Sequence, residues 1–218
     1  MLNISCLHSA QSNIAVFEAA RRAERLDEVM LKHRVRSDLL AIAEKEGRPS
    51  ADVLRQTADE LVNLARGAHG VLLTCSTLGP AARVAAAELD IPVMRIDEVL
   101  AQRAVKDGGA VTVLCAIGST IGPTRAIFEE AAMGAGAEVE VRLVPGAWEH
   151  FRAERFEDYG GVIGEAADEP ADEGAVTVAL AQASMSGAAD YARHPVLTSP
   201  RAGLTAIVDR AQASIGVF

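Results

Sequence analysis

The chain has 218 residues, half of them hydrophobic, so it can bury a sizeable core as one large domain or two small ones. Its formal net charge is -9 at pH 7, and no basic stripe interrupts the acidic excess, which argues against a nucleic-acid or anionic-membrane partner. Aromatic residues make up only 4%, which further weakens any base-stacking role.

Cysteine usage indicates a reducing compartment. Cys6, Cys75 and Cys115 are far apart, odd in number and without a C-x-x-C spacing, which argues against a disulfide framework or a structural zinc site. No segment is long and apolar enough to span a bilayer, and the first residues lack the features of a signal peptide. We therefore expect a cytoplasmic protein with no membrane partner.

The first part of the chain alternates short apolar runs with segments of helical character. Ser50 is suited to cap one of the helices and Gly67 to end it. The expected elements are a strand over 2–7, a helix over 14–26, a strand over 28–35, a helix over 51–66, a strand over 71–73, a helix over 81–89, a strand over 91–96 and a helix over 97–106.

The second part continues the alternation. Pro123 suits the first turn of a helix, and glycines 134 and 136 close it. The expected elements are a strand over 110–116, a helix over 123–133, a strand over 139–144, helices over 147–153 and 156–167, a strand over 175–181, a helix over 186–192, a strand over 196–198 and a helix over 200–213. Strands that alternate with helices predict an α/β fold with parallel sheets and helices on both faces.

Cys75 stands where the strand over 71–73 turns into the next helix. Ligands usually bind at the carboxyl ends of parallel strands, and the N–H groups of a following helix favour anions, including a thiolate. A cysteine there should have a lowered pKa and raised reactivity. The alternative is a buried, inert cysteine, but the polar neighbours Thr74, Ser76 and Thr77 favour the reactive interpretation.

The strand ends at 73–78 and 180–185 correspond, which aligns Cys75 with Gln182. The starts of the two halves also correspond, since residues 2–7 with their Ser/Asn turn resemble residues 111–116 with the Ser119-Thr120 turn. Two similar α/β halves would place an anion site in the cleft between them.

At this point the chain resembles the Asp/Glu racemase superfamily, which includes aspartate, glutamate and hydantoin racemases, maleate isomerases and arylmalonate decarboxylase. The resemblance covers nearly the whole chain and rests on the Cys75 turn and on the segments 117–124, 181–185 and 197–200. It implies two pseudo-symmetric parallel-sheet halves, one from 1–96 plus 199–218 and the other from 97–198, with a cleft between them. It also implies a cofactor-independent enzyme and, by analogy, a homodimer.

Gln182 stands where two-cysteine members of this superfamily place a second thiol, and an amide exchanges no proton at neutral pH. The resemblance therefore assigns Cys75 and Gln182 to the catalytic positions but leaves the two-base cycle incomplete. His8, His33, Tyr191 and His194 are candidate substitute acids. His8, just past the first strand, is the best placed of them, although a lone histidine in a turn is more often structural.

Polar residues at the turns fit a small carboxylate-containing substrate, bound without a metal. Each of them is also consistent with ordinary turn chemistry or helix capping. We found no dinucleotide fingerprint, P-loop or tyrosine-phosphatase loop, and no His/Cys/carboxylate cluster that indicates a metal. The candidate substrate-binding residues are Ser9, Asn13, Thr74, Ser76, Thr77, Ser119, Thr120 and Ser184.

Three functional hypotheses follow. The first is a racemase or isomerase type of enzyme in which Cys75 acts, as a single thiol, on carbon next to a carboxylate, with a decarboxylase of the same superfamily as its variant. The second is a non-catalytic protein that binds a small carboxylate. The third, a cysteine hydrolase, lacks an evident Cys-His-Asp constellation.

Overall fold

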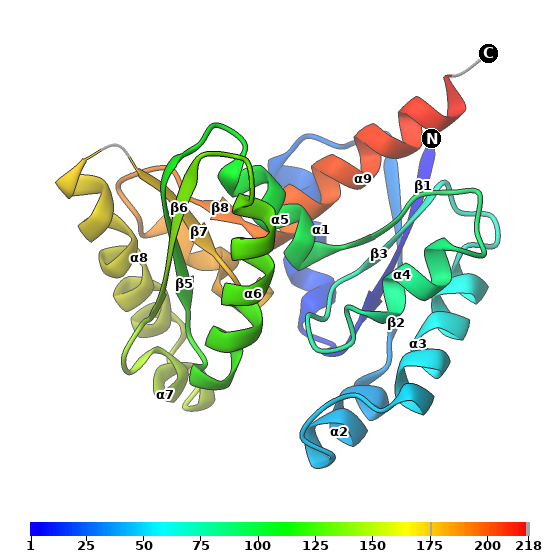
Figure 1. The fold of residues 1–218 in the computed structure, drawn as a ribbon, viewed down its shortest axis with the longest axis horizontal. Helices are drawn as coiled ribbons and strands as arrows, with labels where there is room; N and C mark the ends of the chain where they lie inside the picture. The colour runs from blue at the N-terminus through cyan, green and yellow to red at the C-terminus, as the bar shows by residue number, and fades with distance from the viewer. Residues whose placement is uncertain (175, 217–218) are drawn as a thin grey trace. The chain divides into compact units, whose positions relative to one another are not determined.

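The computed structural model describes residues 1–174 and 176–216. Their contacts divide the chain into two compact units (Figure 1). Unit 1 comprises Met1–Ile96 together with the chain from Gly203 onward, and unit 2 comprises Asp97–Ala202. The chain thus builds one unit from two separate segments and the other from a single continuous one.

Unit 1 contains one four-stranded sheet with strand order β2-β1-β3-β4, and every neighbouring pair is parallel. This agrees with the α/β prediction. Its elements are β1 (Leu2–His8), α1 (Asn13–Ala23), β2 (Val29–Val35), α2 (Ser37–Lys45), α3 (Ala51–Leu64), β3 (Gly70–Leu73), α4 (Ala81–Ala86), β4 (Val93–Arg95) and most of α9 (Ser199–Ile215).

Helices cover both faces of the unit 1 sheet. On one face, Leu7 and Leu73 join a core cluster with buried residues of α2, α3 and α4. On the other face, Ile207 of α9 packs so closely over Gly70 of β3 that an added Cβ would lie 2.9 Å from its side chain. The missing side chain at Gly70 therefore lets α9 approach the sheet.

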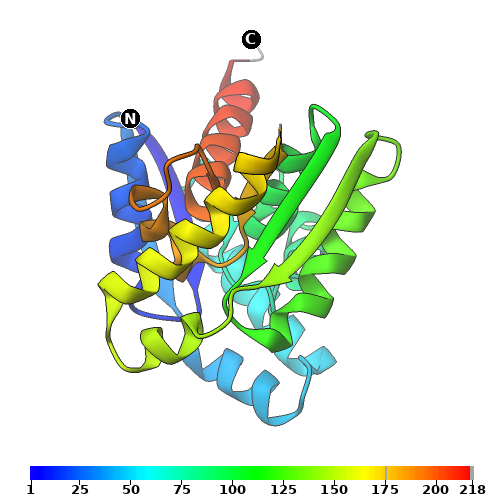
Figure 2. The same cartoon turned by 90° about the vertical axis from the view of Figure 1, so that its left-hand side faces the viewer.

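Unit 2 contains a second four-stranded parallel sheet, with strand order β6-β5-β7-β8. Figure 2 shows β5 and β6 side by side, pointing the same way. The elements are α5 (Ile96–Val105), β5 (Gly109–Cys115), η1 (Gly118–Thr120), α6 (Ile121–Ala132), β6 (Ala137–Leu143), α7 (Ala147–Arg152), α8 (Phe156–Glu173), β7 (Val176–Leu180), η2 (Ala183–Asp190) and β8 (Leu197–Thr198).

The core of unit 2 lies between the sheet and α8. Leu114, Val178 and Leu180 of the strands pack with Ile163 and Ala167 of that helix. Helix α6 lies against β6. With helices packed on each sheet and all strand pairs parallel, the predicted pair of α/β halves is confirmed.

Three segments differ from the sequence prediction. Helix α2 was not predicted, because only Leu39 and Ala43 of this short helix are buried and its apolar pattern is correspondingly weak. The helix expected over 186–192 is instead the 3-10 helix η2, which begins earlier, and α8 continues past 167 with Pro170 inside it. Ala175, the expected first residue of a strand, lies outside the described residues.

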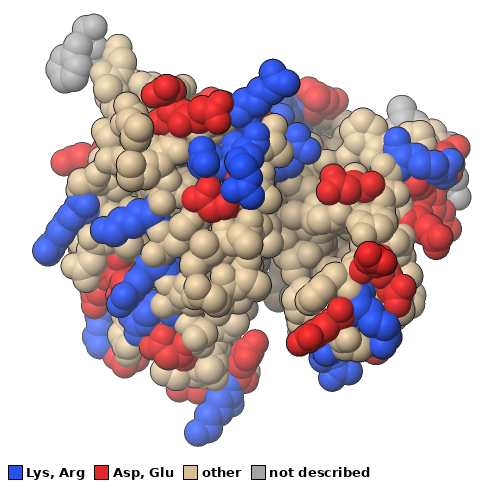
Figure 3. All heavy atoms as spheres, turned by 180° about the vertical axis from the view of Figure 1, so that it is seen from behind, with Lys and Arg blue, Asp and Glu red and all other residues tan. Residues whose placement is uncertain are grey.

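The surface mixes both signs of charge. Figure 3 shows Lys and Arg side chains interspersed with Asp and Glu side chains on the face it presents. Among the described residues, no helix is long and apolar enough to cross a membrane.

Candidate functional site

Cys75 lies directly beyond β3, at the base of a turn that leads into α4. Its side chain is buried, with 7% of the residue exposed, and belongs to the same core cluster as Leu73 and Leu78. The next two residues, Ser76 and Thr77, are exposed. The apolar residues on either side thus anchor the turn, and a thiol lies beneath a short polar surface.

The carboxyl ends of β1 and β3 bring the other unit 1 candidates to this edge. The two strands are parallel neighbours, and the Thr74 N–H donates to the Leu7 carbonyl at 3.0 Å just past their last paired residues. Ser9 and Asn13 belong to the connection from β1 to α1, and Asn13 is the first residue of α1. Ligands usually bind at this edge of an α/β sheet.

Arg95, at the end of β4, is a residue that the sequence analysis missed. It is nearly buried, and its backbone pairs with Leu73 of β3. A Cβ added at Gly79 would lie 2.3 Å from its guanidinium, so the arginine packs directly against the turn that follows Cys75. Gly79 is required for that contact, and a fixed positive charge lies against the Cys75 turn.

His8 is buried, and each of its ring nitrogens lies within hydrogen-bonding distance of a side chain. Its Nδ1 lies 2.8 Å from Thr74 Oγ1 and its Nε2 lies 2.8 Å from His33 Nδ1. Burial, and then the neighbouring His33, lower the pKa of His8 to about 4. A neutral imidazole with both nitrogens engaged is poorly prepared to deliver a proton at neutral pH, and its role as second acid stays a prediction.

The His8 network extends outward to α1. His33 Nε2 lies 3.3 Å from Glu18 Oε1, and Glu18 also forms an ion pair with Arg21. Burial opposes ionisation of Glu18, but its hydrogen bonds to Arg21 and His33 outweigh burial and lower its pKa. Cys6 lies beside the two histidines, a cluster that the sequence spacing did not reveal.

Gln182 occupies the matching place in unit 2, just beyond β7. Its Oε1 accepts a 2.7 Å hydrogen bond from the Ala116 N–H, and its Nε2 donates to Thr120 Oγ1 at 3.3 Å. The amide thus joins the ends of β5 and β7. This gives Gln182 a structural function that its position in the sequence did not reveal.

The remaining unit 2 candidates lie at the same edge. Ser119 and Thr120 form η1 after β5, and Thr120 Oγ1 donates to the Ile117 carbonyl at 2.7 Å. Ser184 Oγ lies 3.2 Å from the Tyr159 hydroxyl, whose pKa is raised by burial.

Two further hydroxyls at this edge of unit 2 were not predicted as binding residues. Thr198 Oγ1 and Ser199 Oγ, at the end of β8, are buried and have no hydrogen-bond partner among the described residues. A buried hydroxyl usually finds a partner, so these two are candidates for contact with a ligand. No residue type marks them in the sequence, because serine and threonine are common at strand ends.

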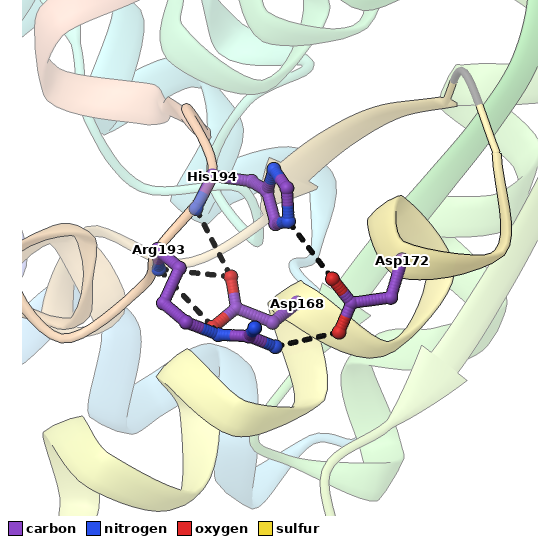
Figure 4. A network of polar contacts seen from close by, with 4 residues as sticks. All are labelled: Asp168, Asp172, Arg193 and His194. Atoms are coloured by element: carbon purple, nitrogen blue, oxygen red, sulfur yellow. Dashed lines mark hydrogen bonds and ion pairs between the residues drawn. The ribbon is translucent and has the colours of Figure 1, made fainter.

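Tyr191 packs against Gly160 and Gly164 of α8, and His194 is held in polar contacts with the same helix. Figure 4 shows His194 paired with Asp172 of α8, while Asp168 accepts hydrogen bonds from the backbone N–H groups of Arg193 and His194. These contacts attach the segment before β8 to the C-terminal end of α8. That end leads directly into β7 and so lies at the amino edge of the sheet. His194 therefore lies at the edge opposite Gln182 within unit 2.

The chain is thus an α/β protein of two parallel-sheet units, one with a cysteine beneath a polar turn at its strand ends. The sequence profile described as Asp/Glu/Hydantoin racemase matches residues 9–207. The chain therefore belongs to the Asp/Glu/hydantoin racemase family and is an enzyme of the isomerase class. Among the curated proteins compared with it by sequence, none matches.

Solved structures share the fold at low sequence identity. Glutamate racemase RacE1 from Bacillus anthracis is 16% identical, with 99% of this chain and 83% of that chain covered and a TM-score of 0.66. Aspartate racemase from Picrophilus torridus is 10% identical, with 99% and 98% covered and a TM-score of 0.69. Allantoin racemase from Pseudomonas fluorescens is 14% identical, with 99% and 92% covered and a TM-score of 0.61.

Proposed function

We propose that the protein is a cofactor-independent enzyme in which the Cys75 thiol acts on the carbon next to a carboxylate of a small acidic substrate. The observation that carries the proposal is the position of Cys75, beneath the exposed Ser76 and Thr77 at the carboxyl edge of a parallel sheet, in a chain of the racemase family. Chemistry in such sheets takes place at this edge.

The surroundings of Cys75 suit an anionic substrate. The Arg95 guanidinium lies against the Cys75 turn at Gly79 and supplies positive charge there. Hydroxyls of the exposed Ser76 and Thr77 and backbone N–H groups of the turn are donors for a carboxylate. A substrate held by these groups would place its α-carbon near the thiol.

A single thiol supports a limited set of reactions. As a thiolate, Cys75 takes the α-proton and becomes a thiol, the substrate becomes enolate-like, and the same thiol returns a proton to the same face, which exchanges the α-hydrogen with solvent and retains the configuration. Alternatively the thiolate adds to an activated double bond, the new single bond rotates, and the thiolate leaves to give the isomer. Both cycles regenerate the thiolate and need no second thiol.

The amide at Gln182 favours a second candidate, a decarboxylase of the same superfamily. Loss of CO2 leaves its electron pair on the α-carbon, and protonation by one thiol then completes the reaction. The Gln182 amide is hydrogen-bonded to Ala116 and Thr120, which supports a structural role for this side chain. Proton delivery from the side of Cys75 alone agrees with that role. That Cys75 and Gln182 face each other across a cleft stays a prediction, as does a homodimer.

Proton NMR in deuterated water with small dicarboxylates, hydantoins and arylmalonates tests these reactions together. It reports α-proton exchange, isomerisation and decarboxylation in one experiment. We expect turnover of at least one of these classes by the wild type and none by Cys75→Ser, whose hydroxyl is far less acidic than a thiol.

Labelling with iodoacetamide supplies an independent measurement. Cys75 should react faster than a simple thiol near neutral pH, while Cys115, fully buried in β5 and with a pKa raised chiefly by burial, should stay unlabelled in the same sample. If Cys75 reacts no faster than a simple thiol and no substrate turns over, the enzymatic proposal is wrong and carboxylate binding without catalysis is the better description.

A further inference from the structure

Three side chains of metal-binding type meet on one face of the unit 1 sheet. Cys6 and His8 are two residues apart on β1, so their side chains point to the same face of the sheet. Cys6 also lies directly opposite His33 of β2 in the strand register. The ligand atoms of the three residues all lie within 4.8 Å of one another. Cys6 and His8 are buried, and 12% of the His33 side chain is exposed.

The outer nitrogens of the two histidines already have partners. In the arrangement in which Thr74 Oγ1 donates its hydrogen to the Leu7 carbonyl at 3.0 Å, it accepts from His8 Nδ1–H at 2.8 Å. The Glu18 carboxylate accepts, so His33 Nε2 carries a hydrogen as well. In neutral rings these assignments leave His8 Nε2 and His33 Nδ1 without hydrogens, facing each other at 2.8 Å.

In this arrangement the two facing lone pairs suit a positive centre between them, either a proton or a metal ion. A proton would join only the nitrogens, whereas a thiophilic cation would also bind the thiolate of Cys6. The outer partners have the arrangement found around metal-ligating histidines, in which the second ring nitrogen donates to a carboxylate or another acceptor and fixes the tautomer.

The fold itself does not require polar groups at these positions. Leu7 pairs with Leu73 in unit 1 as Leu114 pairs with Leu180 in unit 2, which aligns the two sheets residue by residue. Cys6, His8 and His33 then correspond to Val113, Cys115 and Val141, of which Val113 and Val141 form the matching cross-strand pair. A sheet of the same order is thus built in unit 2 without this cluster.

We propose that Cys6, His8 and His33 form a binding site for a thiophilic transition-metal ion, with Zn²⁺ as the representative, oriented by Thr74 and Glu18. Sulfur and imidazole ligands are those that Zn²⁺ prefers, and three protein ligands leave a fourth position for water. Because β2 is an edge strand and its His33 reaches the surface, the site has a route for metal entry.

A small adjustment accompanies binding. Two imidazole nitrogens at tetrahedral angles on one zinc lie about 3.3 Å apart. The 2.8 Å separation of His8 Nε2 and His33 Nδ1 therefore opens by about half an ångström. His33 is free to make this shift because its edge strand pairs on one side only. The inference concerns binding alone and does not depend on the proposed reaction.

Cobalt titration of metal-stripped protein tests the site. We expect one Co²⁺ per chain, a thiolate-to-cobalt charge-transfer absorption, and its loss on addition of Zn²⁺. Cys6→Ala and His33→Gln should abolish the absorption. The variants Cys115→Ala and Cys75→Ser, which remove the other two thiols, should keep it. Glu18→Gln should weaken Co²⁺ binding about 10- to 100-fold through the orientation of His33.

Calorimetric Zn²⁺ titration and thermal unfolding provide readouts independent of colour. Zn²⁺ should raise the Tm of wild type and of Cys115→Ala but not of Cys6→Ala. Absence of the charge-transfer absorption in wild type, or its retention in both Cys6→Ala and His33→Gln, would overturn the proposal and leave a proton-sharing histidine pair. If Cys6→Ala does not fold, the wild-type spectrum and the His33→Gln comparison decide alone.

Discussion

Unit 1 and unit 2 order their strands in the same way, β2-β1-β3-β4 and β6-β5-β7-β8, yet matching positions carry different chemistry. Just beyond the third strand, unit 1 places the thiol of Cys75 and unit 2 the amide of Gln182. Along the first and second strands, unit 1 places the buried Cys6 and the half-buried His33 where unit 2 buries Val113 and Val141.

The comparison separates what the architecture needs from what the chemistry needs. Valines at the matching positions show that a sheet of this order is stable with an apolar face, whereas burial of polar groups costs free energy unless partners compensate it. Residues that are polar in unit 1 alone are therefore candidates for function. Gln182, in contrast, joins the ends of β5 and β7 through its hydrogen bonds to Ala116 and Thr120.

The largest expected effect is on activity, at the Cys75 edge of unit 1. Cys75→Ser should lower turnover by about 10³-fold or more, because general acid–base catalysis by a positioned group contributes on this scale. Gln182→Met, which keeps the side-chain length at the matching position of unit 2, should retain measurable turnover. Equal losses of turnover in the two variants, measured by NMR on folded protein, would show that Cys75 is no more important for catalysis than Gln182.

Exchange of the amide for a thiol should make the two units more alike. Gln182→Cys restores a paired-thiol sequence and is expected to add deuterium incorporation on the second face of the substrate. It also removes the acceptor of the Ala116 N–H, which should cost about 1 to 3 kcal/mol of unfolding free energy.

Two comparisons interpret that experiment. Gln182→Met loses the same hydrogen bonds without gaining a thiol, so it isolates the stability cost in denaturant unfolding. Two-faced exchange already present in wild type would show that another residue supplies the second proton, with His8 the first to examine.

The crossovers into the last strands provide a third test. Unit 1 uses the alanine-rich α4, whereas unit 2 uses η2, whose end at Tyr191 rests on glycines of α8. A Cβ at Gly164 would lie 2.8 Å from the Tyr191 backbone. Gly164→Ala should therefore destabilise the protein by about 1 to 3 kcal/mol, offset in part by the ~1 kcal/mol that alanine gains in a helix.

Gly161→Ala is the matched control in the same helix, because an added Cβ there meets nothing within 4 Å. It should leave stability unchanged or raise it slightly through helix propensity. Urea unfolding midpoints of the two variants give the comparison. If Gly164→Ala is as stable as Gly161→Ala, the close approach of Tyr191 to α8 does not matter for stability.

The smallest expected effect is the pH dependence of the contacts in Figure 4. Burial raises the pKa of Asp168, but hydrogen bonds from the N–H groups of Arg193 and His194 outweigh it, so its pKa lies below the ordinary 3.8. Hydrogen bonds from His194 and Arg193 lower the pKa of Asp172 in the same way. The folded state thus binds these protons less readily than the unfolded chain does.

Their stabilisation is therefore complete above the ordinary aspartate pKa and is lost as the pH falls through the lowered values. The Asp168→Asn/Asp172→Asn double variant should lose less stability than wild type between about pH 4 and pH 2. Thermal unfolding across this range measures the difference. Parallel curves for the two proteins would show that the contacts contribute no linked stability.

The fold was largely predictable from the sequence because apolar runs separated by helical segments specify parallel strands with crossover helices. The buried run before Cys75 and the Ser50 cap of α3 are local signals of this kind, and the Ser50 side chain accepts from the Val53 N–H as expected. Helix α2 was not predicted, because a helix of nine residues with only Leu39 and Ala43 buried gives too few positions to establish a helical period.

The details of the site depend on register and orientation, which one sequence does not contain. Cys6 meets His33 only because β1 and β2 pair without a slip, and a shift of one residue would turn His33 to the other face. Arg95 contacts Gly79, and Gln182 reaches Ala116, through strands that pair at long sequence separation. The residue types in the sequence indicated candidate site residues, but only the tertiary structure shows which residues they contact.

The return of α9 to unit 1 has a consequence for synthesis on the ribosome. All of unit 2 is translated before Gly203, so unit 1 receives the helix that covers Gly70 and Leu72 only after unit 2 has been made. Until then the β3 face beneath Ile207 lacks the cover that α9 provides, and exposed apolar strand surface favours aggregation. Truncation shortly before Gly203 should therefore release nascent chains whose second unit folds while the first needs a chaperone.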